Sequence, residues 1–585
     1  MKEWIITGVD LLPEIEVMVL NEVKNFFPNE YKSFVCDIWL KIESGNYGDF
    51  SLSIAKKISA EIKKDLPQVA EKIADSIKKS KLFEKVSVES NGFINIFLSK
   101  DFIFSHLENS GIVKKSLKGR KILIEYAQPN PYKVMHIGHL RNITIGESLV
   151  RIFEEAGAGV IRANYQGDVG MHIAKCLFEF QKIDQSDYPD DIDGKAELLG
   201  KCYSIGAKKF NEDDEARSEI AKINADIYSG GNEKITSLWK LGKEWSLEKF
   251  RNFYKRVGTY FHKEYFESEV FEDGLKNCIK AFELGILEKD GDAIIFRGEK
   301  YGLDTRVFIN SEGFPTYEGK ELGLAPKEAN DFGKLDKIIH IVGKEQISFF
   351  KVTFKVQELL WPETFNNLQY HLPYGFVNLK EGKMSSRLGN VVLAEDLIND
   401  AKNSIKEIFQ NSEKKPSEDE IERRSEKLAV ASVKYAFLKN NTLKDMYYDK
   451  DSALSMNGDS GIYLLYTFAR IKSILKKSDI KDFDKYIQNK GLKAFLEDEL
   501  ELSLARELIK FECYFFRALS EFLINNLTEF AFRICMFFNS FYTKLPVLKE
   551  ESQEKKVARI YLLKKTSEVL EKVCYLLGFE VLDEI

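Results

Sequence analysis

The sequence has few of the features that mark small secreted proteins or membrane proteins. Its seven cysteines are scattered, none forms a CxxC pair, and the seven histidines do not cluster with them. This spacing indicates reduced thiols, as in a cytoplasmic protein, and predicts that no zinc site is present. The amino terminus shows no signal-peptide pattern, and no apolar run reaches about 18 residues, so we expect no membrane-spanning segment.

A strong excess of one charge is also missing. The formal net charge is −6, with 86 lysines and arginines against 92 aspartates and glutamates, so the balance alone does not indicate a nucleic-acid partner. A local basic face could still bind one. Apolar residues are abundant, and 43 phenylalanines and 25 tyrosines can fill large cores. A chain of 585 residues is too long for one core, and we expect two to four domains.

The two ends of the chain differ in their patterns. Residues 1–115 are predicted to form a small α+β domain, because residues 51–80 carry helical periodicity and the alternating stretch 86–98 indicates a hairpin. From about residue 415 onward we expect no strands. Residues 456–585 are therefore predicted to form an all-helical domain.

The middle of the chain, residues 116–455, is predicted to form an α/β domain. Its short apolar segment 121–125 suits a buried parallel strand. Helical segments alternate with strands after it, which is typical of a doubly wound, Rossmann-like parallel sheet. A charged, mostly helical stretch at about 176–262 indicates an insertion. The further strands are expected at 159–166, 293–298, 306–311 and 337–343.

Two histidines follow the buried strand, in the segment PNPYKVMHIGHLRN. His136 and His139 lie where a helix is expected to begin, at the carboxyl edge of the sheet, which is where such folds bind ligands. A helix amino terminus favours an anion, and Gly138 lets a base or a phosphate approach the backbone. The histidines could donate hydrogen bonds to phosphate oxygens. The alternative is that they only cap the helix.

A second polar segment, KMSSR, occupies residues 383–387. A glycine-flanked loop with two cations and two hydroxyls suits a mobile phosphate clamp, in which Lys383 and Arg387 offset charge on a leaving pyrophosphate. Taken alone, such a segment is more often an ordinary solvated turn. Found after the histidine segment and far along the chain from it, the pair is much more specific than either part.

These two segments resemble the HIGH and KMSK signatures of class I aminoacyl-tRNA synthetases, with Ser386 in place of the last lysine and Arg387 after it. Four longer segments are similar to arginyl-tRNA synthetases, and together they span nearly the whole chain. They are EYAQPNPYKVMHIGHLRN (125–142), NYQGDVGMHIAK (164–175), YDKDSALSMNGDSGIYLLYTFARI (448–471) and YGDFSLSIAKKI (47–58).

The resemblance implies an enzyme that attaches L-arginine to tRNA(Arg) through an arginyl-adenylate, with ATP and substrate-bound Mg²⁺. Residues 116–455 would be the catalytic domain, 1–115 an additional tRNA-binding domain and 456–585 the anticodon-binding domain. A monomer is expected. Three alternatives stay open: another class I synthetase, a catalytically inactive synthetase-like tRNA-binding protein, and a small nucleotidyltransferase that shares the HIGH string. The last is a single-domain protein.

Positions in the matching segments imply the site residues. Arginine needs carboxylates for its guanidinium group and polar groups for its other end. The implied arginine contacts are Glu125, Asn130, His136, Glu267, Tyr317, Glu321 and Gln346. The implied ATP contacts are His136, Gly138, His139, Gly167, Asp168, Gly343, Lys383, Met384 and Ser385. His136, His139, Lys383 and Arg387 would be catalytic, and Tyr463 and Arg470 would contact tRNA.

The chain departs from the arginyl pattern at a few positions. Glu321 stands where the family usually has aspartate, and Ser53 where it often has asparagine. The chain ends at Ile585, in FEVLDEI, without the family's usual terminal string. Glu321 keeps the negative charge of aspartate but extends its reach by one methylene group.

Overall fold

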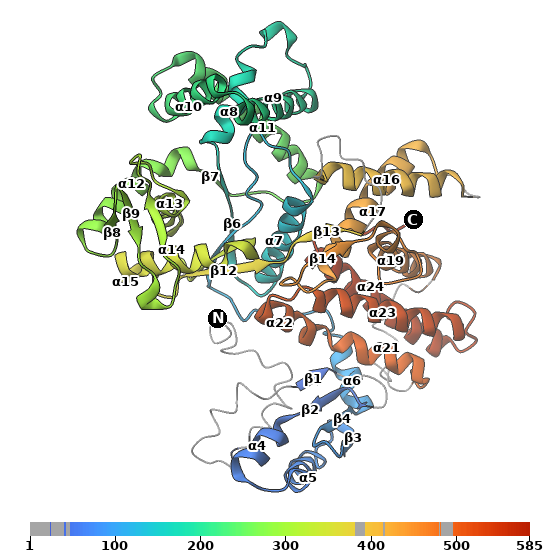
Figure 1. Ribbon diagram of the computed structural model, residues 1–585. Helices are drawn as coiled ribbons and strands as arrows, with labels where there is room; N and C mark the ends of the chain where they lie inside the picture. The colour runs from blue at the N-terminus through green and yellow to red at the C-terminus, as the bar shows by residue number, and fades with distance from the viewer. Residues whose placement is uncertain are drawn as a thin grey trace. The chain divides into compact units, whose positions relative to one another are not determined.

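The computed structural model describes residues 47–380, 392–412, 416–478 and 495–585, with positions 21, 24 and 480 and the strand Leu40–Ile42 besides. The chain forms two compact units. The first comprises Met1–Ser116, Ser455–Leu576 and Glu580–Ile585, and the second comprises Leu117–Leu454 and Leu577–Phe579. Figure 1 gives the elements of both units, and each unit is described by itself.

A five-stranded sheet organises the second unit, in the order β12–β11–β5–β6–β7. All its neighbouring strands are parallel. The order reverses beside β5, since β6 and β7 continue to one side and β11 and β12 to the other. Ligands of doubly wound sheets bind at such a switch point. The strands are β5 (Lys121–Glu125), β6 (Gly159–Gln166), β7 (Lys263–Phe266), β11 (Lys337–Gly343) and β12 (Gln369–Tyr374).

Helices connect these strands, and a helical insertion follows β6, as predicted. α7 (Ile137–Glu155) links β5 to β6 and is buried along most of its length. The insertion has its own apolar core, which includes Phe180, Leu199 and Trp245, and its helices group together at one end of the unit (Figure 1, top). They are α8 (Met171–Phe180), α9 (Ile192–Glu212), α10 (Asp214–Ser229) and α11 (Glu233–Arg256), with η3 (Gln185–Asp187).

The prediction for segments 293–298 and 306–311 was wrong in one respect. They form strands, but these pair antiparallel in a separate small sheet, β8 (Glu288–Asp290), β9 (Ala293–Phe296) and β10 (Arg306–Ile309). A parallel crossover needs about a dozen residues or more, and the connection from β9 to β10 is shorter. The nearby helices are α12 (Glu267–Glu283), α13 (Tyr317–Asp331), α14 (Ile347–Leu360) and α15 (Pro362–Phe365), with η4 (Glu299–Tyr301) and η5 (Lys344–Gln346).

A short strand also lies beyond residue 415, where none was expected. β14 (Met446–Tyr448) pairs in parallel with β13 (Val377–Leu379). Three residues are too few to show strand periodicity, which explains the wrong prediction. The helices around this pair are α16 (Ala394–Gln410), α17 (Glu418–Leu438) and α18 (Lys450–Ala453).

The first unit contains an antiparallel sheet and a helical bundle. Strands β3 (Phe83–Val88) and β4 (Ile94–Leu98) form the predicted hairpin. The stretch 51–80 with helical periodicity forms two helices rather than one, because Asp65 caps a second helix within it. The other elements near the sheet are β1 (Leu40–Ile42), β2 (Phe50–Leu52), α4 (Ile54–Ile62), α5 (Leu66–Ile77) and α6 (Lys100–Leu107). The bundle consists of α19 (Gly461–Lys477), α21 (Glu499–Ile509), α22 (Phe511–Glu521), α23 (Asn525–Lys544) and α24 (Gln553–Leu576).

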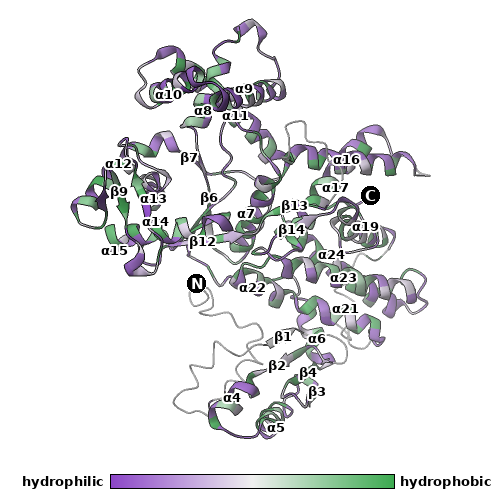
Figure 2. Ribbon diagram, viewed as in Figure 1, coloured by the Kyte–Doolittle hydropathy of each residue, from purple (hydrophilic) through white to green (hydrophobic). Residues whose placement is uncertain are grey.

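The predicted fold class is therefore confirmed: a parallel α/β domain, an α+β amino-terminal domain and a helical carboxyl-terminal domain. Most helices show both hydrophobic and hydrophilic residues along their length (Figure 2), as expected for helices that bury one face. Among the described residues, no helix is long and apolar enough to cross a membrane.

Candidate active site

The loop between β5 and α7 has an unusual backbone. Six described residues other than glycine have a positive φ, and Ala127, Gln128 and Tyr132 account for three of them, at 77°, 52° and 67°. Side chains hold this loop: Asn142 Oδ1 accepts from the Ala127 N–H at 2.6 Å, and Ser246 Oγ accepts from the Tyr132 N–H at 2.9 Å. Strained backbone of this kind persists where the surroundings impose it, and it concentrates at functional sites.

The two histidines of the loop cap α7 and leave one nitrogen each for a ligand. Nδ1 of His136 accepts from the Gly138 N–H at 3.1 Å, and Nδ1 of His139 accepts from the His136 N–H at 3.2 Å. Burial, with help from Lys133, lowers the pKa of His136, and burial with the His136 charge lowers that of His139 to about 3. Both rings are therefore neutral near pH 7, with the hydrogen on Nε2 as a donor. Capping thus occupies Nδ1 of each ring, and the assignment of the two rings to ligands stays a prediction.

The second signature, KMSSR, lies outside the described residues, so the assignments of Lys383, Met384, Ser385 and Arg387 stay predictions. The residues that follow it are nevertheless described. The Ile137 N–H donates to Val392 O at 2.9 Å, and the Ala394 N–H donates to Met135 O at 3.0 Å. The chain that leaves the second signature is thus hydrogen-bonded to the backbone of the first.

Three of the predicted arginine contacts are buried carboxylates that influence one another. Glu125 ends β5, Glu267 begins α12 and Glu321 lies on α13. Burial, then the charges of Glu125 and Glu267, raise the pKa of Glu321 well above its usual range. Burial also raises the pKa of Glu267, although Lys320 Nζ lies 2.6 Å from its Oε2. Buried carboxylates in excess of their cationic partners are suited to a guanidinium group.

Asn130 and Gly167 connect this carboxylate group to the histidine loop. Oδ1 of Asn130 accepts from the Gly167 N–H at 3.1 Å. A Cβ at Gly167 would lie 2.9 Å from Asn130 Oδ1 and 3.2 Å from Glu267 Oε1, so a larger residue would push both side chains from these positions. The Nδ2 group of Asn130 could therefore be offered to a substrate oxygen while its Oδ1 is held.

Asp168, predicted to contact ATP, is fully engaged with protein groups instead. Its oxygens accept from Lys243 Nζ at 2.6 Å, from the Ser268 N–H at 2.9 Å and from Ser268 Oγ at 2.6 Å. Lys243 belongs to α11 and Ser268 to α12. Asp168 thus joins the insertion to the start of α12, and its assignment to ATP stays a prediction without a free carboxylate oxygen to support it.

The other predicted contacts lie near the ends of β11 and the start of α13. Tyr317 is the first residue of α13 and is 67% exposed, with Lys320 Nζ 5.5 Å from the centre of its ring. Gly343 ends β11, and Gln346 follows in η5 with its side chain half-buried. An exposed aromatic ring beside buried carboxylates can cover the side chain of a bound amino acid.

The sequence analysis missed several residues of this site. Lys320 stands between Gly319 and Glu321 in the sequence and was overlooked, yet it is the cation that pairs with Glu267. Nε2 of His172 contacts Gly167 O at 3.1 Å, and burial, then Lys133, lowers its pKa to about 4. His340 interrupts the apolar strand β11, and its Nδ1 lies 2.7 Å from Glu125 Oε2. A lone polar residue in a buried strand was the signal that could have indicated it.

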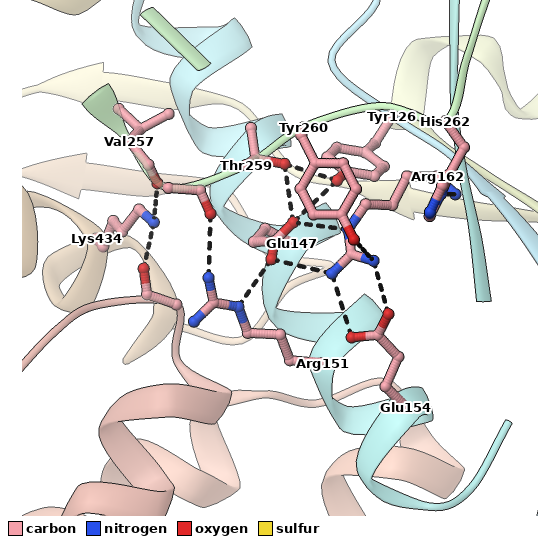
Figure 3. A network of polar contacts seen from close by, with 12 residues as sticks. Tyr126, Glu147, Arg151, Glu154, Arg162, Val257, Thr259, Tyr260, His262 and Lys434 are labelled. Atoms are coloured by element: carbon pink, nitrogen blue, oxygen red, sulfur yellow. Dashed lines mark hydrogen bonds and ion pairs between the residues drawn. The ribbon is translucent and has the colours of Figure 1, made fainter. Parts of the chain in front are cut away.

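Tyr126, the residue after Glu125 in the chain, belongs to a buried polar network (Figure 3). Glu147 Oε2 accepts from Tyr126 OH at 3.0 Å and from Thr259 Oγ1 at 2.8 Å. Burial alone would raise the pKa of Glu147, but the guanidinium groups of Arg162 and Arg151 outweigh it and lower the pKa. This network fixes Tyr126, and with it the backbone that presents Glu125.

The two predicted tRNA contacts lie on α19 in the first unit. Tyr463 OH accepts from Asn539 Nδ2 at 2.7 Å, and Arg470 Nη1 donates to Asn539 Oδ1 at 3.3 Å. They therefore share one face of the helix, as their spacing of two turns predicts. The Arg470 guanidinium group also lies 4.8 Å from the centre of the Tyr466 ring. Their contact with tRNA stays a prediction.

Comparison with known proteins covers all three parts of the chain. Residues 103–450 match the model described as "tRNA synthetases class I (R), catalytic domain". Residues 464–585 match the "DALR anticodon binding domain", and residues 14–98 match the "Arginyl tRNA synthetase N terminal domain". The matches follow the three predicted parts in order.

Individual relatives agree with these models. The arginine–tRNA ligase of Treponema denticola is 34% identical, over 82% of this chain and 83% of that protein. That of Fusobacterium nucleatum is 30% identical, over 98% of this chain and 99% of that protein. Among solved structures, arginyl-tRNA synthetase of Thermus thermophilus has a similar fold, with a TM-score of 0.80 at 18% identity, covering 98% of this chain and 100% of that one.

The parallel sheet, its switch point and the HIGH helix that follows β5 define a class I aminoacyl-tRNA synthetase, a class that uses ATP. The three matching domain models narrow that class to the enzymes for arginine. The chain belongs to the arginyl-tRNA synthetase family, and its activity is arginine–tRNA ligation. A small single-domain nucleotidyltransferase and a synthetase for another amino acid are thereby excluded.

Proposed function

We propose that the site in the second unit forms arginyl-adenylate from L-arginine and MgATP and then passes the arginyl group to tRNA(Arg). In the first step a carboxylate oxygen of arginine forms a bond to the α-phosphorus of ATP, and the bond to pyrophosphate breaks. In the second step a ribose hydroxyl of the terminal adenosine attacks the arginyl carbonyl, and AMP leaves. The observation that carries this proposal is the group of buried carboxylates, which Asn130 and Gly167 connect to the loop that leads into α7.

The carboxylates would hold the side chain of arginine. Glu125 and Glu321 would accept hydrogen bonds from the guanidinium group, and Tyr317 would cover it. Glu267 already carries the Lys320 ion pair at 2.6 Å, so it contributes less negative charge to the substrate. At the other end of arginine, Asn130 and Gln346 are the polar groups proposed for its amino and carboxylate groups.

The neutral histidines would act on the nucleotide. Nε2–H of His136 and of His139 can donate to phosphate oxygens as negative charge moves toward pyrophosphate, and Gly138 leaves room for the nucleotide. Lys383 and Arg387 would approach the same phosphates from the second signature. Catalysis by these groups consists of positioning and charge stabilisation, with Mg²⁺ arriving on the ATP phosphates.

The first unit would bind tRNA. Tyr463 and Arg470 would stack on and contact unpaired bases of the anticodon loop, the usual way in which proteins read splayed bases. The amino-terminal domain would add a second contact to the same tRNA. We expect a monomer that works in the cytoplasm, where its three substrates are found, and we expect tRNA to be required for the first step.

Arginine-dependent exchange of labelled pyrophosphate into ATP tests this proposal, measured with and without tRNA(Arg). Exchange that requires arginine and is stimulated by tRNA is the expected result. If exchange is missing under both conditions while tRNA still binds tightly, the chain is a catalytically inactive tRNA-binding relative. Replacing arginine by lysine or citrulline checks whether the guanidinium charge and shape are both read.

A further inference from the structure

Lys434 of α17 is a buried lysine whose amino group binds two backbone carbonyls. The residue is 1% exposed, and its Nζ donates to Val257 O (Figure 3) and to Gly578 O. Within the described part of the chain, no carboxylate lies at ion-pair distance from this nitrogen. Lysine is almost never fully buried unless it is paired. The position of Lys434 therefore has to be explained by the two carbonyls that it holds.

The two carbonyls come from distant parts of the chain. Val257 ends α11, the last helix of the insertion, and its carbonyl is one of the groups that a helix end leaves without an internal partner. Gly578 has a φ of 81° and follows the end of α24 at Leu576 by two residues. The stretch Leu577–Phe579 belongs to the second unit, whereas α24 belongs to the first. Lys434 thus joins, within the second unit, the end of the insertion to the chain that directly follows the bundle.

The turn 257–259 is held at each of its three residues by a different side chain. The lysine binds the first residue. Arg151 Nη2 donates to Gly258 O at 3.0 Å, and Glu147 Oε2 accepts from Thr259 Oγ1 at 2.8 Å. The two α7 side chains also pair with each other, with Nε of the arginine 2.7 Å from Oε1 of the glutamate. The turn is therefore fixed between α17 and α7.

Thr259 connects this turn to the arginine half of the proposed active site. Its Oγ1 lies 2.7 Å from the OH of Tyr126, which is fully buried. The centre of the Tyr126 ring lies 4.8 Å from that of Phe261, and a Cβ at Gly146 would come within 2.4 Å of the ring. A ring held on these sides leaves its backbone little freedom, and that backbone directly follows Glu125.

We propose that Lys434 is a positioning residue for arginine binding. It ties the chain that leaves the anticodon-binding helices to the turn 257–259, and this turn holds Tyr126 and hence Glu125. Affinity for arginine then depends on where the end of α24 places Gly578. The proposal rests on the role proposed for Glu125 in binding arginine.

A contribution to stability alone does not account for this lysine. Burial, then the charge of Arg151, lowers the pKa of Lys434 to about 7, although Glu147 raises it. The unfolded chain holds the same proton up to the ordinary pKa of 10.5, so the ionisation of Lys434 reduces stability near neutral pH. The neutral amine still has two N–H groups, one for each carbonyl. Both contacts therefore persist whether or not the amine is protonated.

Lys434→Met and Gly578→Ala test this contact from its two sides. Methionine fills most of the same space but donates no hydrogen bond. A Cβ at Gly578 would lie 3.3 Å from Lys434 Nζ and would crowd it. In each variant we expect the KM for arginine to rise about threefold to thirtyfold, while kcat, the KM for ATP and the Kd for tRNA stay unchanged. Gly302→Ala is the matched control, because Gly302 has a φ of 67° and open space around it.

The double variant separates a shared contact from two independent defects. If Lys434 and Gly578 act through one contact, the KM for arginine of the double variant should equal that of the worse single variant. Losses that multiply would overturn the proposal. A normal KM for arginine in Lys434→Met, together with a lower unfolding temperature, would show that the lysine acts on stability only and would also overturn it.

Hydrogen–deuterium exchange of the full-length protein measures the positioning without any substrate. The amides of Tyr126 and Thr259 donate to Ala163 O at 3.1 Å and to Tyr254 O at 2.9 Å. In Lys434→Met both should exchange faster, by about threefold or more. Unchanged exchange at both amides would overturn the proposal. If both exchange faster but pyrophosphate exchange in the unmodified enzyme never depends on arginine, the positioning by Lys434 stands and the proposed function fails.

Discussion

The two proposed halves of the active site, one for the nucleotide and one for arginine, are built in different ways. The centre of the nucleotide half is one short stretch of chain, with a strained backbone at Ala127, Gln128 and Tyr132 and neutral histidines that cap their own helix. The arginine half gathers buried polar side chains from separate elements: β5, α12, α13 and β11. Local backbone geometry therefore shapes the first half, whereas long-range folding shapes the second.

Because of this difference, substitutions in the two halves should affect the protein in different ways. In the arginine half, a substitution that removes one charge leaves its partners buried without compensation, which is costly. A substitution in the nucleotide half can keep the cap and remove only the donor, so its effect is confined to the rate of the chemical step. The experiments below test that division, in order of expected effect.

Glu125→Gln should have the largest effect, because it leaves both His340 and the incoming guanidinium group without a carboxylate. Breaking a buried ion pair costs about 3–5 kcal/mol, which corresponds to a fall in kcat/KM for arginine of about two to three and a half orders of magnitude. Arginine-dependent pyrophosphate exchange measures it. Glu288→Gln, at an exposed site in the small antiparallel sheet, is the control. An unchanged KM for arginine would remove Glu125 from the pocket.

His139→Asn should reduce the rate of adenylate formation by about a hundredfold to a thousandfold, as expected when one donor to a developing charge is lost. The Asn oxygen can replace Nδ1 as the acceptor of the His136 N–H, so the helix cap remains. Thermal unfolding checks that stability is kept, and single-turnover exchange measures the rate.

His139→Gln is the matched variant, because its amide N–H reaches the position of Nε2 while the cap is lost. We expect it to recover part of the rate and to unfold at a lower temperature. A full rate in His139→Asn would show that the histidine only caps α7.

The sequence predicted the local fold of the nucleotide half well, because its signals are local. A buried strand, a turn and a helix start follow one another within 121–142, and each can be read from a few adjacent residues. Pairing between the two signatures could be anticipated from their order, and the contact of Val392 with Ile137 agrees with it. The strain at Ala127 was not predictable, since no residue type marks it.

The arginine half could not be predicted from residue patterns alone. Glu125 and Glu321 were identified only through resemblance to a family, and Lys320 and His340 were missed. Each is a single polar residue in an otherwise apolar or charged segment, and only the three-dimensional arrangement brings them together. For the same reason the strands at 293–298 and 306–311 were assigned to the wrong sheet: pairing is a long-range property.

The buried carboxyl groups predict that arginine binding releases a proton. Burial, then Glu125 and Glu267, raise the pKa of Glu321, so the free enzyme keeps a proton there above the usual carboxyl range. A bound guanidinium group favours the ionised form and lowers that pKa. Between the two pKa values, affinity for arginine should therefore rise with pH, by at most about tenfold per unit, and level off above the higher one.

Titration calorimetry in two buffers with different heats of ionisation measures the released proton. Glu321→Gln should lose its share of the release, and any remainder should come from Glu328, whose pKa burial and Glu125 also raise. Equal heats in both buffers would mean that the pocket is already ionised before arginine binds. The nucleotide half should show no such linkage, because His139, with a pKa of about 3, is neutral throughout.

The variant with the smallest expected effect tests whether the strained backbone at Ala127 contributes to the rate of pyrophosphate exchange. Ala127→Gly removes the penalty of a φ of 77° but gives the unfolded chain more freedom, so the free energy of unfolding should change by less than about 1 kcal/mol. The looser loop should position His136 and His139 less well and slow exchange a few-fold. Lys63→Gly makes the same change at a φ of 51°, at the end of α4 in the other unit. If both variants leave exchange unchanged, the strained loop is a by-product of the fold and does not contribute to the rate.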